Sequence, residues 1–278
     1  MPSVDNRIFP VEKQGGIHYG KTNIHVENVC DQLKLLIVST YKEEYFNQTS
    51  DATHEFTDEI TSNGIETMKV LGVQDMDGDT FLHQVIILEQ TNIAIKIIQL
   101  LYNSDLLNIC NCLFQTPLHL AVLTRQTIIV RRVLEAGART DLQDHRGNTP
   151  LHIACQIGDS EIVSLLMCSV SSRLNTEIRN FDGLKCLHLA AFHNSTEVVR
   201  ILLNGGADIN AGDAKSGRTI LHWAAECGKG ELIDLLLSRK DVDVNSETYD
   251  GITAFELAEA NGHLEIMRKF SQKLSVIN

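Results

Sequence analysis

Aromatic residues are scarce in this sequence of 278 residues: they make up 5% of it and include a single tryptophan. Hydrophobic residues as a whole reach 43%, so the apolar residues are mostly Leu, Ile, Val and Ala. A chain of this length can form one or two globular domains, or one solenoid of several repeats. The composition favours a folded core in which helices pack through aliphatic side chains.

Positive charge is also in short supply, with 24 Lys and Arg residues against 36 Asp and Glu, a net charge of −12. Direct binding of DNA or RNA needs a stripe of basic side chains that neutralises phosphates. The acidic balance therefore argues against a nucleic-acid partner. It fits instead a protein partner that presents Lys or Arg.

Long apolar runs are missing as well. Residues 1–20 lack the basic end followed by an apolar stretch that marks a secretory signal peptide. Residues 81–101 are rich in apolar side chains, but a membrane span needs roughly 20 of them in a row, and this stretch is interrupted by Gln84, Glu89, Gln90, Asn92 and Lys96. We therefore expect no membrane contact and residence in the cytoplasm, with shuttling to the nucleus left open.

Sequence signatures of catalysis and metal binding are absent. The seven cysteines form an odd set without Cys-x-x-Cys spacing, and Cys110-x-Cys112 alone is not a zinc framework. Such thiols are typical of a reduced, intracellular protein. No Gly-x-Ser-x-Gly, Gly-rich phosphate loop or His-Glu-x-x-His occurs in the sequence. We expect no enzymatic activity, no cofactor and no metal site.

What the sequence does contain is a recurring helix start, shown in full by residues 146–154, Arg-Gly-Asn-Thr-Pro-Leu-His-Ile-Ala. Gly147 and Asn148 suit a turn with unusual dihedral angles. Thr149 can cap the following helix, and Pro150 fits its first position, where the backbone amide needs no partner. The residues that follow begin an apolar face at helical spacing.

Six copies of this element lie 33 to 36 residues apart and start at Thr80, Thr116, Thr149, Lys185, Thr219 and Thr253. A period of about 33 residues with a Thr-Pro-Leu-His-x-Ala element is typical of the ankyrin repeat, a β-turn followed by two antiparallel helices. We predict an all-α ankyrin-repeat solenoid over residues 74–278, with six repeats that start near 77, 113, 146, 182, 216 and 250. The first repeat departs from the motif at Gln84 and Val85, so looser packing is expected around Val85.

A histidine recurs in five copies of the element, which raises the question of a metal or acid–base site. No cluster of Cys, His or carboxylate side chains completes a ligand set in the sequence. Each ring is instead expected at a helix start, from which it can bond to neighbouring backbone and tie adjacent turns together. We interpret these residues as structural, and they are His83, His119, His152, His188 and His222.

Residues 1–73 form a separate N-terminal region, expected to be largely disordered because residues 1–25 show no periodicity. Apolar residues at helical spacing predict one amphipathic helix at about 26–46. Its segment 29–38 also resembles a leucine-rich nuclear-export signal, so nuclear export and packing on the first repeat or on a partner both stay open. The stretch 43–66 is polar and acidic and is typical of a solvated linker.

Several strings are more specific than a generic ankyrin repeat. Those at 77–83, 107–108 and 115–122 resemble the first two repeats of the inhibitor-of-κB (IκB) family, which includes insect Cactus, and those at 146–152, 210–219 and 244–251 resemble its later repeats. The resemblance implies a protein, monomeric when free, that binds dimers of Rel/NF-κB transcription factors. The first two repeats would cover the partner's nuclear-localisation segment, and the later repeats would hold its dimerisation domains.

The resemblance points to partner-binding residues on two parts of the solenoid. Asp75, Asp77 and Asp79 make an acidic first finger that suits a Lys- and Arg-rich segment. Tryptophan and tyrosine anchors often dominate interfaces, but core packing remains the alternative for the tryptophan and turn formation for the aspartates. The later candidates lie on fingers or at inner-helix starts, and they are Asp182, Asp213, Trp223, Tyr249 and Asp250.

Two departures from the family concern regulation. Its degradation signal has the form Asp-Ser-Gly-x-x-Ser, which residues 62–67 match only in outline, because Asn63 cannot gain the charge of a phosphate. A degenerate degron at Asn63, Gly64 and Thr67 and a chance match both stay open. No acidic tail rich in Pro and Ser follows the sixth repeat in this sequence. We therefore expect a signal-insensitive member, similar to viral ankyrin mimics that lack both regulatory ends.

The function that the resemblance implies is a cytoplasmic inhibitor. It would sequester a Rel/NF-κB-type dimer by masking its localisation segment and blocking its binding to DNA. A general ankyrin-repeat adaptor or a nuclear Rel coactivator is the alternative. Nuclear residence with the partner's DNA binding intact would favour the coactivator.

Overall fold

The structure is a computed structural model, and it describes residues 71–168 and 175–277. The chain divides into two units, residues 1–61 and 62–278, and all described residues belong to the second. The predicted helix at 26–46, the segment 29–38 and the degron residues Asn63, Gly64 and Thr67 lie outside the described residues. These predictions remain predictions.

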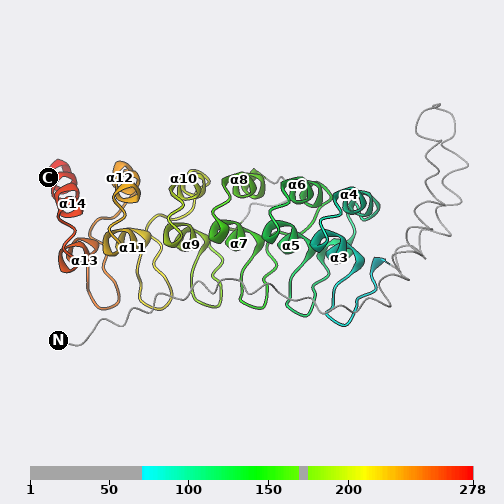
Figure 1. Cartoon of the computed structure of the whole chain (residues 1–278). Helices are drawn as coiled ribbons and strands as arrows, with labels where there is room; N and C mark the ends of the chain where they lie inside the picture. The colour runs from blue at the N-terminus through cyan, green and yellow to red at the C-terminus, as the bar shows by residue number, and fades with distance from the viewer. Residues whose placement is uncertain (1–70, 169–174, 278) are drawn as a thin grey trace, which may run out of the picture. The chain divides into compact units, whose positions relative to one another are not determined.

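The described residues form six pairs of helices, arranged in two rows (Figure 1). The inner row consists of α3 (Phe81–Ile87), α5 (Pro117–Leu123), α7 (Pro150–Ile157), α9 (Cys186–Phe192), α11 (Ile220–Glu226) and α13 (Ala254–Ala260). The outer row consists of α4 (Thr91–Leu100), α6 (Thr127–Glu135), α8 (Ser160–Cys168), α10 (Thr196–Asn204), α12 (Gly230–Ser238) and α14 (Leu264–Ile277), and a 3₁₀ helix, η2 (Asp105–Asn108), follows α4. Neighbouring helices pack within each row and within each pair. The predicted all-α solenoid of six repeats is confirmed.

The inner helices begin where the recurring element predicts. Thr149 is the N-cap of α7, where its Oγ1 accepts a hydrogen bond from the backbone amide of His152 at 3.4 Å, and Pro150 is the first helical residue. Thr116 and Thr253 cap α5 and α13 in the same way. Because these caps satisfy amides that lack a partner within the helix, helices of seven or eight residues start at defined positions.

Four of the five histidines at these helix starts join consecutive repeats; His152 does not, because its buried Nε2 has no hydrogen-bond partner among the described residues. The Nδ1 of His83 accepts the backbone amide of Thr80 at 3.1 Å, so Nε2 carries the proton and donates to the carbonyl of Gln115 in the next repeat at 3.0 Å. Burial lowers the pKa of His83 to about 4, which keeps the ring neutral and able to play both roles. Three further histidines make the same bond between repeats, from Nε2 to a backbone carbonyl oxygen at 3.0 to 3.1 Å: His119 to Asn148, His188 to Ala211 and His222 to Ile252. These bonds agree with a structural role for the histidines.

The loops between repeats form fingers on the side of the inner row away from the outer helices (Figure 1). The backbone amide of Cys112 in the second finger donates to the carbonyl of Asp77 in the first at 2.9 Å. Equivalent bonds of 2.9 to 3.1 Å run from His145 to Leu113, from Phe181 to Arg146, from Ala214 to Gly183 and from Tyr249 to Ser216. The fingers therefore form one continuous hydrogen-bonded ladder along the solenoid.

The first repeat buries one of the two residues at which it departs from the motif. Val85 is 1% exposed, and looser packing around it stays a prediction, because burial does not measure packing density. The other departure from the motif, Gln84, turns toward the first finger, where its Nε2 donates to Asp75 Oδ2 at 2.9 Å. The polar side chain of Gln84 therefore lies outside the core, and the apolar side chain of Val85 lies within it.

Candidate partner-binding surface

The first finger, residues 75–79, presents two of its three aspartates to solvent. Asp75 and Asp77 are exposed, whereas Asp79 is buried. Asp75 Oδ1 accepts the backbone amides of Asp77 and Asp79 at 3.0 and 2.8 Å, which holds the turn. Asp79 accepts a hydrogen bond from Asn111 of the second finger at 2.9 Å, and burial raises its pKa. Asp79 therefore joins two fingers, and the exposed carboxylates lie on Asp75 and Asp77.

The two aspartates of the fourth and fifth fingers also differ. Asp182 is exposed, and Lys215 of the next finger donates to its Oδ1 at 3.1 Å. Both side chains of this pair are more than half exposed, so it adds at most about 1 kcal/mol to stability. Asp213 is buried; burial opposes its ionisation, but hydrogen bonds from Ser216 and Lys215 hold its pKa below the usual value. Asp213 shapes its finger, whereas Asp182 is open to a partner.

Trp223 lies within a compact cluster on α9 and α11. Its ring meets that of Phe192 edge to face, with centroids 5.5 Å apart, and the Arg218 guanidinium lies 5.7 Å from the ring centroid. Arg218 Nη1 also donates to Glu226 Oε2 at 2.7 Å. Trp223 is partly exposed, and its Nε1 has no hydrogen-bond partner among the described residues. Trp223 is therefore not fully buried in the core. Its ring is held in place by Phe192 and Arg218, and part of its side chain is accessible to solvent.

The sixth finger carries the last two candidates. Tyr249 and Asp250 are both exposed. The ring of Tyr249 lies over Gly217 of the fifth finger, where an added Cβ would come within 2.7 Å of it, and its hydroxyl donates to the carbonyl of Asp213 at 3.4 Å. These contacts hold the ring of Tyr249 against the fifth finger.

The fingertips carry large exposed apolar side chains, of which the sequence analysis identified Tyr249 and missed Met76 and Phe181. Met76, Phe181 and Tyr249 are 93%, 72% and 71% exposed. Each stands two residues before a glycine with positive φ, at Gly78, Gly183 and Gly251. That spacing places a side chain at the tip of a finger, and it could have identified the fingertip residues from the sequence. Of the three, only Tyr249 was selected.

The described residues show neither a metal site nor a membrane-spanning helix. No group of three or more His, Cys, Asp or Glu side chains in residues 71–168 and 175–277 could hold a metal ion. No helix in the same ranges is long and apolar enough to cross a membrane. The surface of this part of the chain offers exposed charge and aromatic rings, which are suited to contact with another macromolecule.

Comparison with known proteins agrees with the repeat architecture. A family model described as "Ankyrin repeats (3 copies)" matches residues 126–213 and 211–276. Among solved structures, the chain is similar to the ankyrin repeat domain of Bcl-3, described as "a unique member of the IkappaB protein family", with a TM-score of 0.67 and 36% identity. That match covers 71% of this chain and 87% of the Bcl-3 domain.

Curated relatives point to the same group. The chain is 42% identical to NF-kappa-B inhibitor alpha of Gallus gallus over 197 residues, which is 69% of this chain and 62% of that protein. It is 39% identical to the B-cell lymphoma 3 protein homolog of Mus musculus, covering 70% of this chain and 44% of the relative. It is 38% identical to the NF-kappa-B p105 subunit of Gallus gallus, covering 70% of this chain and 20% of the relative. The chain thus spans less than two thirds of each of these relatives.

The structure and the comparisons both agree with the ankyrin-repeat family that the sequence predicts. The family model covers more than half of the chain, and the similarity to the Bcl-3 domain extends over nearly all of that domain. The chain belongs to the ankyrin-repeat family, and within it to the IκB-like proteins.

Proposed function

We propose that this chain binds a Rel/NF-κB-type dimer and holds it in the cytoplasm, by covering its basic localisation segment and blocking its engagement with DNA. The observation that carries the proposal is the 42% identity, over 197 residues, to a protein named NF-kappa-B inhibitor alpha. The exposed carboxylates of Asp75 and Asp77 support it, because they place negative charge where a Lys- and Arg-rich segment would bind.

The mechanism uses two parts of the solenoid. The first finger attracts and orients the basic segment, since complementary charge raises the rate and the specificity of association. The cluster around Trp223 then supplies an aromatic anchor four repeats later, where Phe192 and Arg218 already fix the ring. Contact along several repeats buries more than about 2,000 Å², the range of long-lived assemblies.

The test is a binding measurement on purified proteins. The full chain is mixed with a Rel homology dimer that includes its basic segment, and the complex is followed by calorimetry and light scattering. We expect a tight complex containing one copy of this chain per dimer at physiological salt. Failure to bind under these conditions would overturn the proposal.

A second candidate is a nuclear coactivator that binds the dimer and leaves its DNA contacts intact. The likeness to the ankyrin domain of Bcl-3, a member of the IκB family described as unique, favours this candidate. The two functions differ in one measurable outcome. When added to a preformed complex of the Rel dimer with its DNA site, an inhibitor releases the DNA, whereas a coactivator forms a ternary complex.

A further inference from the structure

The tip of the second finger, residues 112–114, differs in composition from the tips of the other five fingers. Its residues Cys112, Leu113 and Phe114 are all exposed, and none of them is charged. In the other fingers the last two of these places hold a charged or polar residue followed by glycine: Asp77-Gly78, Arg146-Gly147, Asp182-Gly183, Ser216-Gly217 and Asp250-Gly251. The second finger therefore departs from the other fingers twice, and both departures add apolar surface at its tip.

Phe114 has the backbone conformation of the glycines that it replaces. Its φ is +56°, and its amide donates to the carbonyl of Asn111 at 2.8 Å. Equivalent bonds of 2.8 to 3.0 Å close four other fingers, from Gly78 to Asp75, Gly147 to Asp144, Gly183 to Asn180 and Gly251 to Thr248. A bulky residue seldom adopts a positive φ, because its Cβ crowds the backbone, so Phe114 is strained where glycine would not be.

Packing of the Phe114 ring does not offset this strain. The side chain is 61% exposed, and no pair of aromatic rings in contact among the described residues includes it. The other two exposed fingertip rings differ, since Phe181 lies on Gly147 and Tyr249 lies on Gly217. Strained residues cluster at functional sites, where an outside contact gives the reason for the strain.

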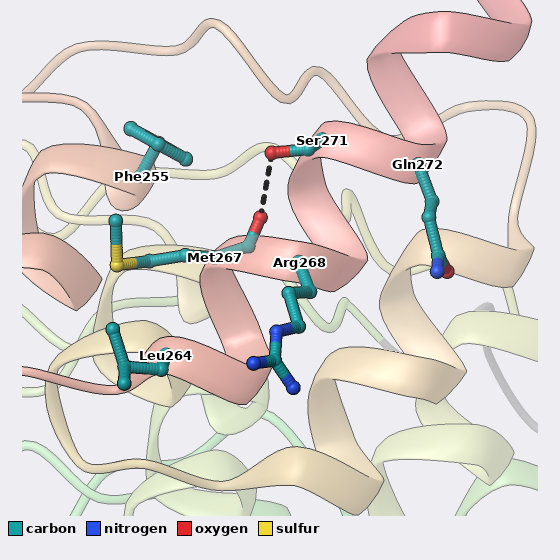
Figure 2. Close-up of a pocket in the computed structure, with 6 residues that line it drawn as sticks. All are labelled: Phe255, Leu264, Met267, Arg268, Ser271 and Gln272. Carbon is teal, nitrogen blue, oxygen red and sulfur yellow. Dashed lines mark hydrogen bonds between the residues drawn. The ribbon is translucent and has the colours of Figure 1, made fainter.

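Other exposed apolar residues do not combine these features. Phe255, Leu264 and Met267 line a groove of about 460 Å³ together with Arg268 (Figure 2). These residues lie on α13 and α14, and none of them has a positive φ. Their exposure involves no backbone strain, so the second fingertip remains the place where strain and apolar exposure coincide.

Negative charge adjoins the second fingertip on one side. The amide of Cys112 donates to the carbonyl of Asp77 at 2.9 Å, so the first two fingers touch at their tips. The carboxylates of Asp75 and Asp77 are exposed there. The third finger instead presents Arg146, which is also exposed. A cation is therefore attracted on the side of the first finger, next to the apolar tip of the second.

We propose that the tips of the first two fingers bind a protein segment in which an apolar side chain is flanked by Lys or Arg. Leu113 and Phe114 receive the apolar side chain, and Asp77 faces the cation. A nucleic acid or an anionic membrane is a poorer occupant, because the carboxylates repel phosphate groups. The inference goes beyond the proposed function, in which charge alone holds the basic segment, and it applies to any protein that presents a segment of this chemistry.

The first part of the test compares three labelled synthetic peptides by fluorescence anisotropy with the full chain. One has two central Leu residues flanked by Lys, the second has Ser in place of Leu, and the third has Glu in place of Lys. We expect the Leu–Lys peptide to bind about tenfold more tightly than the Ser–Lys peptide, through apolar burial. The Leu–Glu peptide should show no saturable binding, because the first finger repels it.

The second part of the test separates binding from folding. Phe114→Gly restores the residue of the other fingers, so it should raise the midpoint of urea denaturation and weaken binding of the Leu–Lys peptide about tenfold. Arg125→Gly is the matched control: Arg125 also has a φ of +56°, but it lies in the turn between α5 and α6, where Gly158, Gly228 and Gly262 stand in other repeats. It should raise the midpoint in the same way and leave peptide binding unchanged.

Several results would overturn the proposal. These are equal affinities of the Leu–Lys and Ser–Lys peptides, unchanged binding by Phe114→Gly, or a midpoint that falls in Phe114→Gly while it rises in Arg125→Gly. A dimer of the chain that Phe114→Gly dissociates, seen by light scattering, would also overturn it, since the occupant is then a second copy. No Rel dimer is used, so failure of the proposed function leaves these outcomes unaffected.

Discussion

The phenyl ring of Phe181 lies on Gly147, one finger earlier in the solenoid. A Cβ at Gly147 would stand 2.6 Å from Cδ1 of Phe181, and the φ of Gly147 is +76°. This glycine therefore meets two demands, a left-handed backbone at the turn and a flat surface for the ring of the next finger. The exposed aromatic residue is held by the finger before it.

Replacing this glycine should destabilise the solenoid by more than backbone strain alone. Gly147→Ala places a methyl group into the Phe181 ring and keeps an unfavourable φ, so we expect the free energy of unfolding to fall by roughly 2–3 kcal/mol. Urea denaturation measures the change. Gly262→Ala is the matched control, because its φ is +72° and nothing lies within 4 Å of an added Cβ. It should cost only about 1 kcal/mol, and equal losses in the two variants would contradict the ring contact.

The buried histidines predict a pH dependence of stability. The pKa of His83 is about 4 in the folded chain, below its value of 6.5 in the unfolded chain, and burial also lowers the pKa values of His119, His188 and His222. The unfolded chain therefore binds more protons between pH 6.5 and 4, so the stabilisation is fully present above pH 6.5 and is lost as pH falls toward 4. Urea denaturation at pH 7.5 and 5.0 should show a clear loss at the lower pH.

The share of one histidine can be isolated with His83→Gln. The sixth repeat has Glu256 at this position, where its carboxylate accepts the amide of Thr253 at 2.8 Å, so Gln can keep that bond. The loss of stability between pH 7.5 and 5.0 should be roughly 2 kcal/mol smaller in this variant than in the unchanged chain. An unchanged pH dependence would show that His83 titrates normally.

Trp223 should matter for binding far more than for folding. Leu stands at its position in three other inner helices, as Leu120, Leu189 and Leu257, so Trp223→Leu suits the repeat and should alter the free energy of unfolding by no more than about 1 kcal/mol. The same change removes an ordered aromatic anchor, for which we expect at least tenfold weaker binding of the Rel dimer by calorimetry. Unaltered affinity would assign the tryptophan to packing alone.

Local chemistry explains which parts of the fold were predictable from sequence. Thr149 and Pro150 act within one helical turn, so their spacing alone predicts where α7 begins, and six copies of that signal predict the whole solenoid. The exposure of a finger aspartate depends on a residue in another repeat. Asp79 is buried because Asn111, 32 residues later, donates to it, and no pattern within the first finger indicates this.

The measurement that tests the central claim most directly is a charge cycle on the first finger. Asp75→Asn keeps the oxygen that holds the turn, and Asn111 and Asn180 occupy the same position in their own fingers, so the double variant Asp75→Asn, Asp77→Asn should fold normally. Its affinity for the Rel dimer is compared with that of the unchanged chain, using dimers with and without the basic segment. Glu135→Lys, on the outer helix α6, serves as the surface-charge control.

We predict that the double variant binds the complete dimer about tenfold more weakly, with an effect that shrinks at high salt and disappears when the basic segment is removed. Equal affinities of the double variant and the unchanged chain for the complete dimer at low salt would contradict the account.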